Sequence, residues 1–140
     1  MKINKAKARK AMRQKNPSAY RELIENQIDL LLSTFPPNTK IYAYEALPGE
    51  VDIDRLGLDP IPEDLNDAIN DPADVYLIPM IGANNSKYRL GRGTGFYDRL
   101  LKKVPHALAV GVISNHRFIE FQEEGHDVPM DIIITETGQR

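Results

Sequence analysis

Residues 88–103, YRLGRGTGFYDRLLKK, set three closely spaced glycines among three arginines. The glycines are Gly91, Gly93 and Gly95, and one acid, Asp98, follows them. Closely spaced glycines ahead of a helix let backbone N–H groups approach an anion at the helix N-terminus, and planar guanidinium groups suit phosphate oxygens. The run therefore predicts an anion site. The same residues would also suit a surface turn in which glycines adopt positive φ angles and the arginines are solvated.

The spacing of these glycines matches neither of two common nucleotide-binding motifs. The dinucleotide fingerprint needs two residues before its last glycine, and the P-loop ends in Gly-Lys-Ser/Thr. The spacing alone therefore indicates an anion site without identifying the anion.

Charge is strongly segregated along the chain, although the formal net charge is only −2. Residues 1–21 carry eight Lys or Arg and no acid, residues 45–74 carry ten acids and one base, and residues 87–103 carry six bases and one acid. An acidic segment between basic ones would repel part of a nucleic-acid duplex. We therefore expect a small, highly charged ligand and no nucleic acid, with a nucleic-acid-binding module as an alternative.

Length and composition predict a single globular domain over residues 1–140. The absence of cysteine excludes disulfides, thiolate metal sites and a cysteine nucleophile. No apolar run approaches the length of a membrane span, and the basic start lacks the apolar stretch of a secretory signal. We expect no membrane association and a cytoplasmic location.

The periodicity of apolar residues predicts alternating helices and strands that must position the glycine run. Helices are expected at 4–15, 17–34, 96–103 and, on weaker patterning, 115–123, and buried parallel strands at 40–46, 74–80, 107–113 and 131–135. Asn16 and Pro17 suit the start of the second helix. The pattern indicates a three-layer α/β/α fold around a mainly parallel sheet, in which ligands bind beyond the carboxyl ends of the strands.

Four segments resemble the 5-formyltetrahydrofolate cyclo-ligase family, also called methenyltetrahydrofolate synthetases. They are KAKARKAMR, LPGEVDI, RLGRGTGFYDRLL and HDVPMDIIIT, in the family's order. The family's usual loop is close to RLGRGGGYYDRFL, from which Thr94 and Phe96 depart. The resemblance covers residues 5–15, 40–54 and 74–136 and implies a Rossmann-like cyclo-ligase fold.

This resemblance implies an enzyme that uses ATP and Mg²⁺ to convert 5-formyltetrahydrofolate to 5,10-methenyltetrahydrofolate. Such enzymes phosphorylate the formyl oxygen, after which the neighbouring amine attacks the activated carbon and phosphate leaves. Phosphoryl transfer depends mainly on positioning and charge neutralisation. A monomer or weak homodimer is expected.

Carried over to this chain, the resemblance assigns three groups of residues. Arg92 is the candidate catalytic residue, and Glu50, Glu45 and Tyr97 are the candidate substrate contacts. Asp98 and Asp131 correspond to magnesium ligands. The ATP-binding residues are Lys5, Arg9, Arg89, Leu90, Gly91, Arg92, Gly93, Thr94, Gly95, Phe96 and Tyr97.

Simpler roles compete with several of these assignments. Asp98 is also placed to complement a helix dipole, and Lys5 and Arg9, four residues apart on one helix face, would also suit a solvated basic helix. The histidines at 106, 116 and 126 lack metal-ligand spacing, so we expect local hydrogen-bonding roles.

One departure concerns the middle of the chain. Known members have a further strand and helix after the Glu-Val-Asp segment, where this chain has only LGLDPIPEDLNDAINDP. We therefore expect part of the folate pocket wall to be absent. A shortened paralogue that binds a nucleotide or phosphate ligand without cyclo-ligase turnover is the alternative function.

Overall fold

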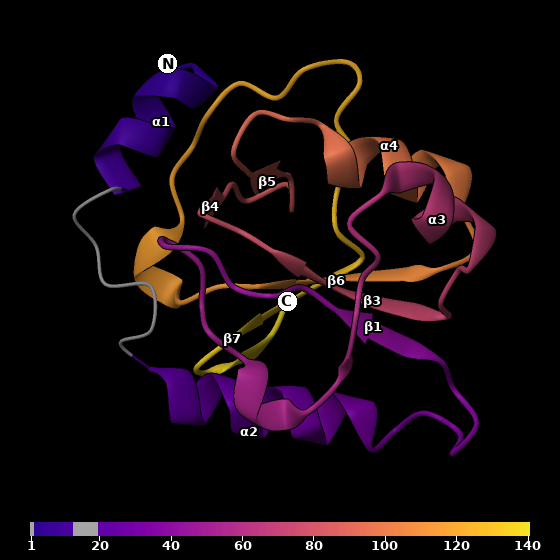
Figure 1. The fold of residues 1–140 in the computed structure, drawn as a ribbon. Helices are drawn as coiled ribbons and strands as arrows, with labels where there is room; N and C mark the ends of the chain where they lie inside the picture. The colour runs from indigo at the N-terminus through magenta and orange to yellow at the C-terminus, as the bar shows by residue number, and fades with distance from the viewer. Residues whose placement is uncertain (1, 13–19) are drawn as a thin grey trace.

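A mostly parallel sheet forms the centre of the computed structural model, which describes residues 2–12 and 20–140 (Figure 1). Within those residues the sheet has six strands in the order β2-β1-β3-β6-β7-β8, and only the β7–β8 pair is antiparallel. The strands are β1 (Ile41–Ala43), β2 (Asp59–Pro60), β3 (Val75–Pro79), β6 (Leu108–Val112), β7 (Ile132–Thr135) and β8 (Gly138–Gln139). The predicted α/β fold with a mainly parallel sheet is confirmed.

Helices cover both faces of this sheet and make three layers (Figure 1). Helix α2 (Arg21–Leu32) packs on one face through Ile24, Ile28 and Leu31, which recur at helical spacing. Helices α3 (Leu65–Asn70) and α4 (Phe96–Lys103) pack on the other face. The central strand β3 is buried along its whole length because alternate side chains enter the two cores.

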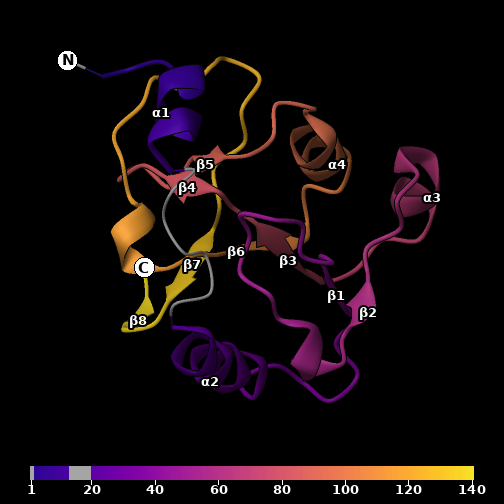
Figure 2. The same ribbon diagram turned by 60° about the vertical axis from the view of Figure 1, so that its left-hand side comes forward.

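A small sheet and helix α1 (Lys5–Met12) extend the fold beyond the main layers (Figure 2). The small sheet pairs β4 (Gly82–Ala83) with β5 (Arg89–Leu90) in antiparallel fashion. Ala8 and Met12 of α1 pack with Leu90 and Phe121 in a separate core cluster. This packing brings the N-terminal helix beside the segment that leads into the glycine run.

The four predicted buried strands are present, but the predicted helix at 115–123 is wrong. A 3₁₀ turn, η2, covers only Asn115–Arg117, and the chain then runs extended. The Ile119 amide donates to Ala83 O at 2.9 Å and the Gln122 amide to Ile3 O at 2.8 Å. Pairing with distant backbone thus replaces the local helical bonds. The predicted cap at Asn16 and Pro17, and the adjoining ends of the first two predicted helices, lie outside the described residues.

The expectation of a missing strand and helix in the middle of the chain is also corrected. Residues 54–70 form a 3₁₀ turn, η1 (Asp54–Leu56), then strand β2 and helix α3. The Asp64 side chain caps α3 by accepting from the Asp67 amide at 3.0 Å. The middle of the chain therefore contains both a strand and a helix.

Within the described ranges, no helix combines the length and the apolar character that crossing a membrane requires.

Candidate active site

The glycine-rich loop, residues 91–95, joins β5 to α4. Gly93 and Gly95 have φ angles of 90° and 74°, in the left-handed region that strains residues with side chains. Gly95 is also the N-cap of α4, so the first backbone N–H groups of that helix point toward the loop. The loop therefore has the backbone geometry of an anion cradle.

Arg89 is fixed beneath this loop. Its Nε and Nη2 donate to Pro79 O at 3.1 and 2.9 Å, and its guanidinium lies 5.0 Å from the centre of the Tyr97 ring. A side chain at Gly91 would overlap the Arg89 guanidinium. Burial lowers the pKa of Arg89, but an arginine stays protonated in proteins, so this group presents a fixed positive charge.

A cavity of about 380 Å³ opens over the loop, and we call it the basic cavity. Five basic side chains border it against two carboxylates. Its lining is Lys5, Arg9, Arg89, Gly91, Gly93, Thr94, Gly95, Asp98, Arg99, Lys102, Glu124 and His126. This excess of positive charge suits a polyanion.

Helix α1 contributes two of these cations, as predicted from their shared helix face. Arg9 Nε donates to Gly91 O at 2.6 Å, which ties the helix to the loop. Lys5 Nζ instead lies 2.7 Å from both carboxylate oxygens of Asp127 and 3.5 Å from Glu124 Oε1. Lys5 is therefore held by acids at the edge of the basic cavity.

One of those acids, Asp127, belongs to a group of side chains that could hold a metal ion. Among the described residues, Asp98, His126 and Asp127 each offer a ligand atom within 4.8 Å of the others. Asp98 Oδ1 accepts from the Val128 amide at 3.0 Å, and Asp127 Oδ2 accepts from the Glu124 amide at 2.7 Å. These backbone bonds hold both carboxylates in place.

The pKa of Asp127 lies below its ordinary value. Burial alone would raise this pKa, but the Glu124 amide and the Lys5 ammonium stabilise the charged form by more. Asp127 is therefore a carboxylate at neutral pH and can act as a metal ligand.

Asp131, the predicted partner of Asp98, lies at the start of β7 and is bonded to the backbone of Ala109. Asp131 Oδ2 accepts from the Ala109 amide at 2.8 Å, and the Asp131 amide donates to Ala109 O. Asp131 directly precedes β7, so it lies at the amino edge of the parallel sheet, whereas the glycine-rich loop lies beyond the carboxyl ends of the strands. Asp127, in the same HDVPMD segment, approaches Asp98 instead.

A second cavity of about 320 Å³ also adjoins the loop, and we call it the mixed cavity. It shares Arg89, Gly93, Thr94 and Gly95 with the basic cavity. Its remaining lining combines carboxylates with apolar and aromatic groups: Tyr44, Glu45, Leu47, Glu50, Ile61, Pro62, Glu63, Pro79, Arg92, Phe96 and Tyr97. Residues 61–63, which follow β2, supply part of the wall that the sequence suggested was absent.

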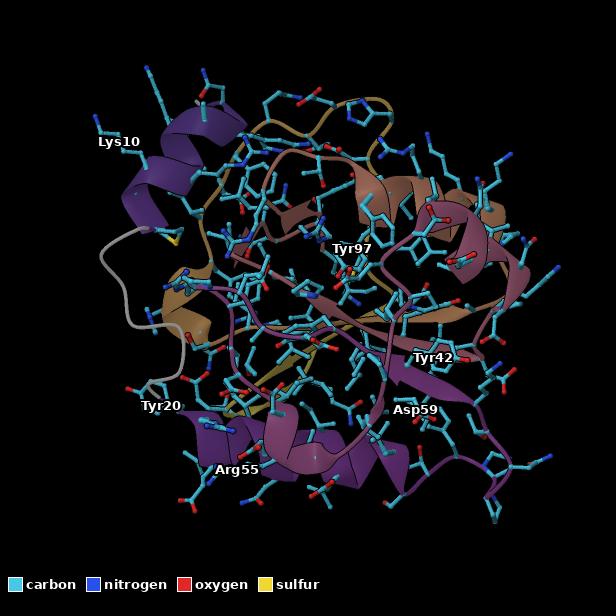
Figure 3. The ribbon with its side chains drawn as sticks, viewed as in Figure 1. Lys10, Tyr20, Tyr42, Arg55, Asp59 and Tyr97 are labelled. Carbon is cyan, nitrogen blue, oxygen red and sulfur yellow. The ribbon has the colours of Figure 1, made fainter. Side chains whose placement is uncertain are left out.

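Both rings of the Phe96–Tyr97 pair border the mixed cavity. Their centroids lie 5.0 Å apart at an interplanar angle of 89°, and Tyr97 points toward the middle of the molecule (Figure 3). Burial raises the pKa of Tyr97 to about 12, so its hydroxyl is neutral at physiological pH. The pair therefore offers apolar ring surface to a ligand.

Glu50 and Arg92 meet at the wall of the mixed cavity. Glu50 is only 5% exposed, and its Oε1 accepts from the Leu47 amide at 2.8 Å while its Oε2 lies 3.4 Å from Arg92 Nε. Arg92 also donates to Pro48 O. The structure thus places Arg92 in the mixed cavity and not among the side chains that line the basic cavity.

Two other predicted residues occupy different positions. The side chain of Leu90 is fully buried in the core cluster with Ala8 and Met12, so it does not line either cavity. Glu45 is exposed at the border of the mixed cavity.

Several lining residues were missed in the sequence. Arg99 and Lys102 follow Gly95 at helical intervals, so the periodicity of α4 could have identified them. Glu63 and Asp127 depend on tertiary placement, and no local spacing identified them. His126, for which the sequence predicts a local hydrogen-bonding role, lies beside Asp98 and Asp127.

The chain is similar in sequence to proteins of one known family. A family model described as the 5-formyltetrahydrofolate cyclo-ligase family matches residues 19–136. Curated relatives named 5-formyltetrahydrofolate cyclo-ligase include one from Mycoplasma pneumoniae, 36% identical over 64 residues, which are 45% of this chain and 39% of the relative. Another, from Mycolicibacterium smegmatis, is 41% identical over 68 residues, 45% of this chain and 34% of the relative. These matches span well under two thirds of the relatives' lengths.

Two solved structures are similar over nearly their full length. A 5,10-methenyltetrahydrofolate synthetase from Mycoplasma pneumoniae matches with a TM-score of 0.74 at 24% identity, covering 94% of this chain and 98% of that one. The corresponding enzyme from Aquifex aeolicus matches with a TM-score of 0.70 at 23% identity, covering 97% and 91%. At these identities the likeness establishes the fold.

Proposed function

This chain belongs to the 5-formyltetrahydrofolate cyclo-ligase family, and from that premise we propose that it converts 5-formyltetrahydrofolate to 5,10-methenyltetrahydrofolate with ATP and Mg²⁺. One observation carries the proposal: the two cavities adjoin the same loop and share Arg89 and residues 93–95 in their walls. A phosphoryl donor in one cavity would therefore face an acceptor in the other, which is the positioning that phosphoryl transfer needs.

The basic cavity fits the polyphosphate of ATP. Backbone donors of residues 93–96 would contact phosphate oxygens, and Arg9 and Arg99 would offer charged groups from two different helices. Arg9 is already tied to the loop through Gly91 O. The cavity therefore presents several positive charges to one ligand, and Arg9 is held beside the loop in advance.

The carboxylates of Asp98 and Asp127 fit a magnesium ion. Hard oxygen ligands suit Mg²⁺, which usually keeps several waters and is held by one or two carboxylates together with substrate phosphates. The ion would neutralise charge on the phosphates when bound. The side chains at 98 and 127 would set its position relative to the loop.

The mixed cavity fits the folate. The rings at 96 and 97 and the side chain of Leu47 offer apolar surface to a planar ring, and Glu50 offers carboxylate oxygens to the adjacent donors of a pterin edge. Its volume of about 320 Å³ lies at the lower end of small-molecule sites.

We assign Arg92 the stabilisation of the transferring phosphoryl group. Glu50 holds Arg92 in this structure, and a pterin that hydrogen-bonds Glu50 would compete with Arg92 for that carboxylate. The released guanidinium would then be available to the phosphoryl group, because Arg92 lies in the loop between the cavities. Substrate binding and charge stabilisation are thereby linked.

A spectrophotometric assay tests the proposed function. Purified protein is mixed with 5-formyltetrahydrofolate, ATP and MgCl₂, and the absorbance of the methenyl product is followed, with each component omitted in turn. We expect product only from the complete mixture. Absence of product from folded protein that still binds ATP would contradict the proposal and favour a family paralogue without turnover.

A further inference from the structure

We propose that His126 is a third protein ligand of the cation held by Asp98 and Asp127, and that the site consequently favours Mn²⁺ over Mg²⁺. The inference rests on the proposed function for the existence of the cation site, and it adds a ligand and a metal preference to it.

The distances permit the three groups to bind one ion. One donor atom from each lies within 4.8 Å of the others. Two ligands on metal bonds of about 2.2 Å can stand at most about 4.4 Å apart. A closure of a few tenths of an ångström, which exposed side chains such as His126 can make, is therefore enough.

The orientation of the imidazole supports ligation. His126 Nε2 lies 3.6 Å from Asp127 Oδ1, and His126 Nδ1 lies 3.8 Å from Glu124 Oε2. One ring nitrogen thus faces a candidate metal ligand, while the other lies near a carboxylate but beyond hydrogen-bond distance. In metal-binding histidines a carboxylate bonded to the second ring nitrogen fixes the tautomer and raises the basicity of the ligating nitrogen, and an approach of several tenths of an ångström by the exposed Glu124 side chain would give it that part.

The metal preference follows from the nitrogen donor. Mg²⁺ strongly prefers oxygen and retains its waters, so it gains little from an imidazole. Oxygen ligands suit Mn²⁺ as well, but Mn²⁺ is the first member of the transition-metal series whose affinity for nitrogen ligands rises above that of Mg²⁺, so it gains more from an added imidazole. Removal of the imidazole should therefore weaken Mn²⁺ binding while Mg²⁺ binding changes little.

Lys5 competes with any cation for Asp127, because its ammonium contacts both carboxylate oxygens. A third ligand would help the ion to displace it. His126 can supply that ligand because it directly precedes Asp127 in the sequence. Its binding would order only one further side chain.

Pulsed electron paramagnetic resonance of Mn²⁺ tests the proposal directly. Mn²⁺ alone is added to untagged protein, and the signal is examined for coupling to ¹⁴N. We expect imidazole coupling in the unaltered protein and in the control His106→Ala, which removes an exposed histidine outside the metal-binding group. His126→Ala should lose it.

The same variants are titrated with Mn²⁺ and, in competition, with Mg²⁺. The affinity ratio of Mn²⁺ to Mg²⁺ should fall in His126→Ala by about tenfold or more, since even outer-shell partners of metal ligands contribute about 10–100-fold. An absence of ¹⁴N coupling in the bound ion, unchanged coupling in His126→Ala, or no Mn²⁺ binding would each overturn the proposal. Methenyl formation distinguishes the two claims: product without ¹⁴N coupling defeats only the ligand assignment, and coupling without product defeats only the proposed reaction.

Discussion

Replacement of Lys5 by methionine should change metal and nucleotide affinity in opposite directions. Lys5 and Asp127 form a doubly contacted ion pair, with side chains only 12% and 4% exposed and an N–O distance of 2.7 Å. A cation that binds Asp127 must displace the ammonium, whereas a polyphosphate in the basic cavity would attract it. One substitution therefore separates the two roles.

The structure sets the expected magnitude. A charge-assisted hydrogen bond contributes about 1.5–3 kcal/mol, and about 1.4 kcal/mol corresponds to a tenfold change in affinity. Without nucleotide, Mn²⁺ or Mg²⁺ should therefore bind Lys5→Met about tenfold or more tightly than the unaltered protein. ATP should bind about tenfold more weakly, because one cation that lines the basic cavity is lost.

Calorimetric titrations with each ligand alone measure both effects. Lys10→Met is the matched control, because Lys10 lies on the same helix but is exposed and points away from the protein (Figure 3). That variant should bind both ligands normally. Metal affinity that falls or stays constant in Lys5→Met, with the protein folded, would refute the competition between Lys5 and the metal for Asp127.

Three further predictions concern neighbouring groups. Asp127→Asn should raise the Mg²⁺ concentration needed for turnover by about tenfold or more. Asp131→Asn should leave that concentration unchanged, since an amide oxygen can still accept from the Ala109 amide. Titration of activity with Mg²⁺ checks both variants, and the reverse result would support Asp131 as the magnesium ligand. Arg92→Ala should cost about 2–3 kcal/mol in kcat/KM with little change in Tm, and near-normal turnover would remove its catalytic role. The pKa of Asp127 is depressed in the folded state, so the stability from this carboxylate is present above its unfolded pKa of about 3.9 and is lost as pH falls through the folded value. Because Lys5 is one cause of the depression, the free energy of unfolding should fall by less on acidification in Lys5→Met than in the unaltered protein, and an equal loss in both would contradict the pairing.

The sequence predicted the core of the fold because its signals were local. The run from 74 to 80 is apolar on both alternating faces, which is typical of a strand that is covered on both sides. In the structure β3 is buried along its whole length. The glycines at 93 and 95 adopt the positive φ angles that such residues permit. These features needed no knowledge of distant contacts.

The failures arose where distant contacts decide the structure. The apolar residues Phe118, Ile119 and Phe121 imitate helical spacing, yet their segment pairs with Ile3 and Ala83 as extended chain. Tertiary hydrogen bonds outweighed a weak local preference there.

The positions of the two aspartates in HDVPMD also depend on distant contacts. A motif gives residue types, but the start of β7 decides which carboxylate lies at the amino edge of the sheet and which lies beside α4. Asp131 directly precedes the strand, and its carboxylate accepts a hydrogen bond from the Ala109 amide. The strand register, and not the motif, therefore identifies the candidate metal ligand.

The central claim is that a phosphoryl group passes between the two cavities and activates the formyl group. The most direct test is to measure whether the formyl oxygen ends in the released phosphate. If the formyl oxygen attacks the terminal phosphorus of ATP, and the amine nitrogen then bonds to the formyl carbon as its C–O bond breaks, the departing phosphate carries that oxygen. With 5-formyltetrahydrofolate labelled with ¹⁸O in the formyl group, mass spectrometry should find one label in each phosphate released, matched to methenyl product and ADP. Methenyl product accompanied by unlabelled phosphate would contradict it.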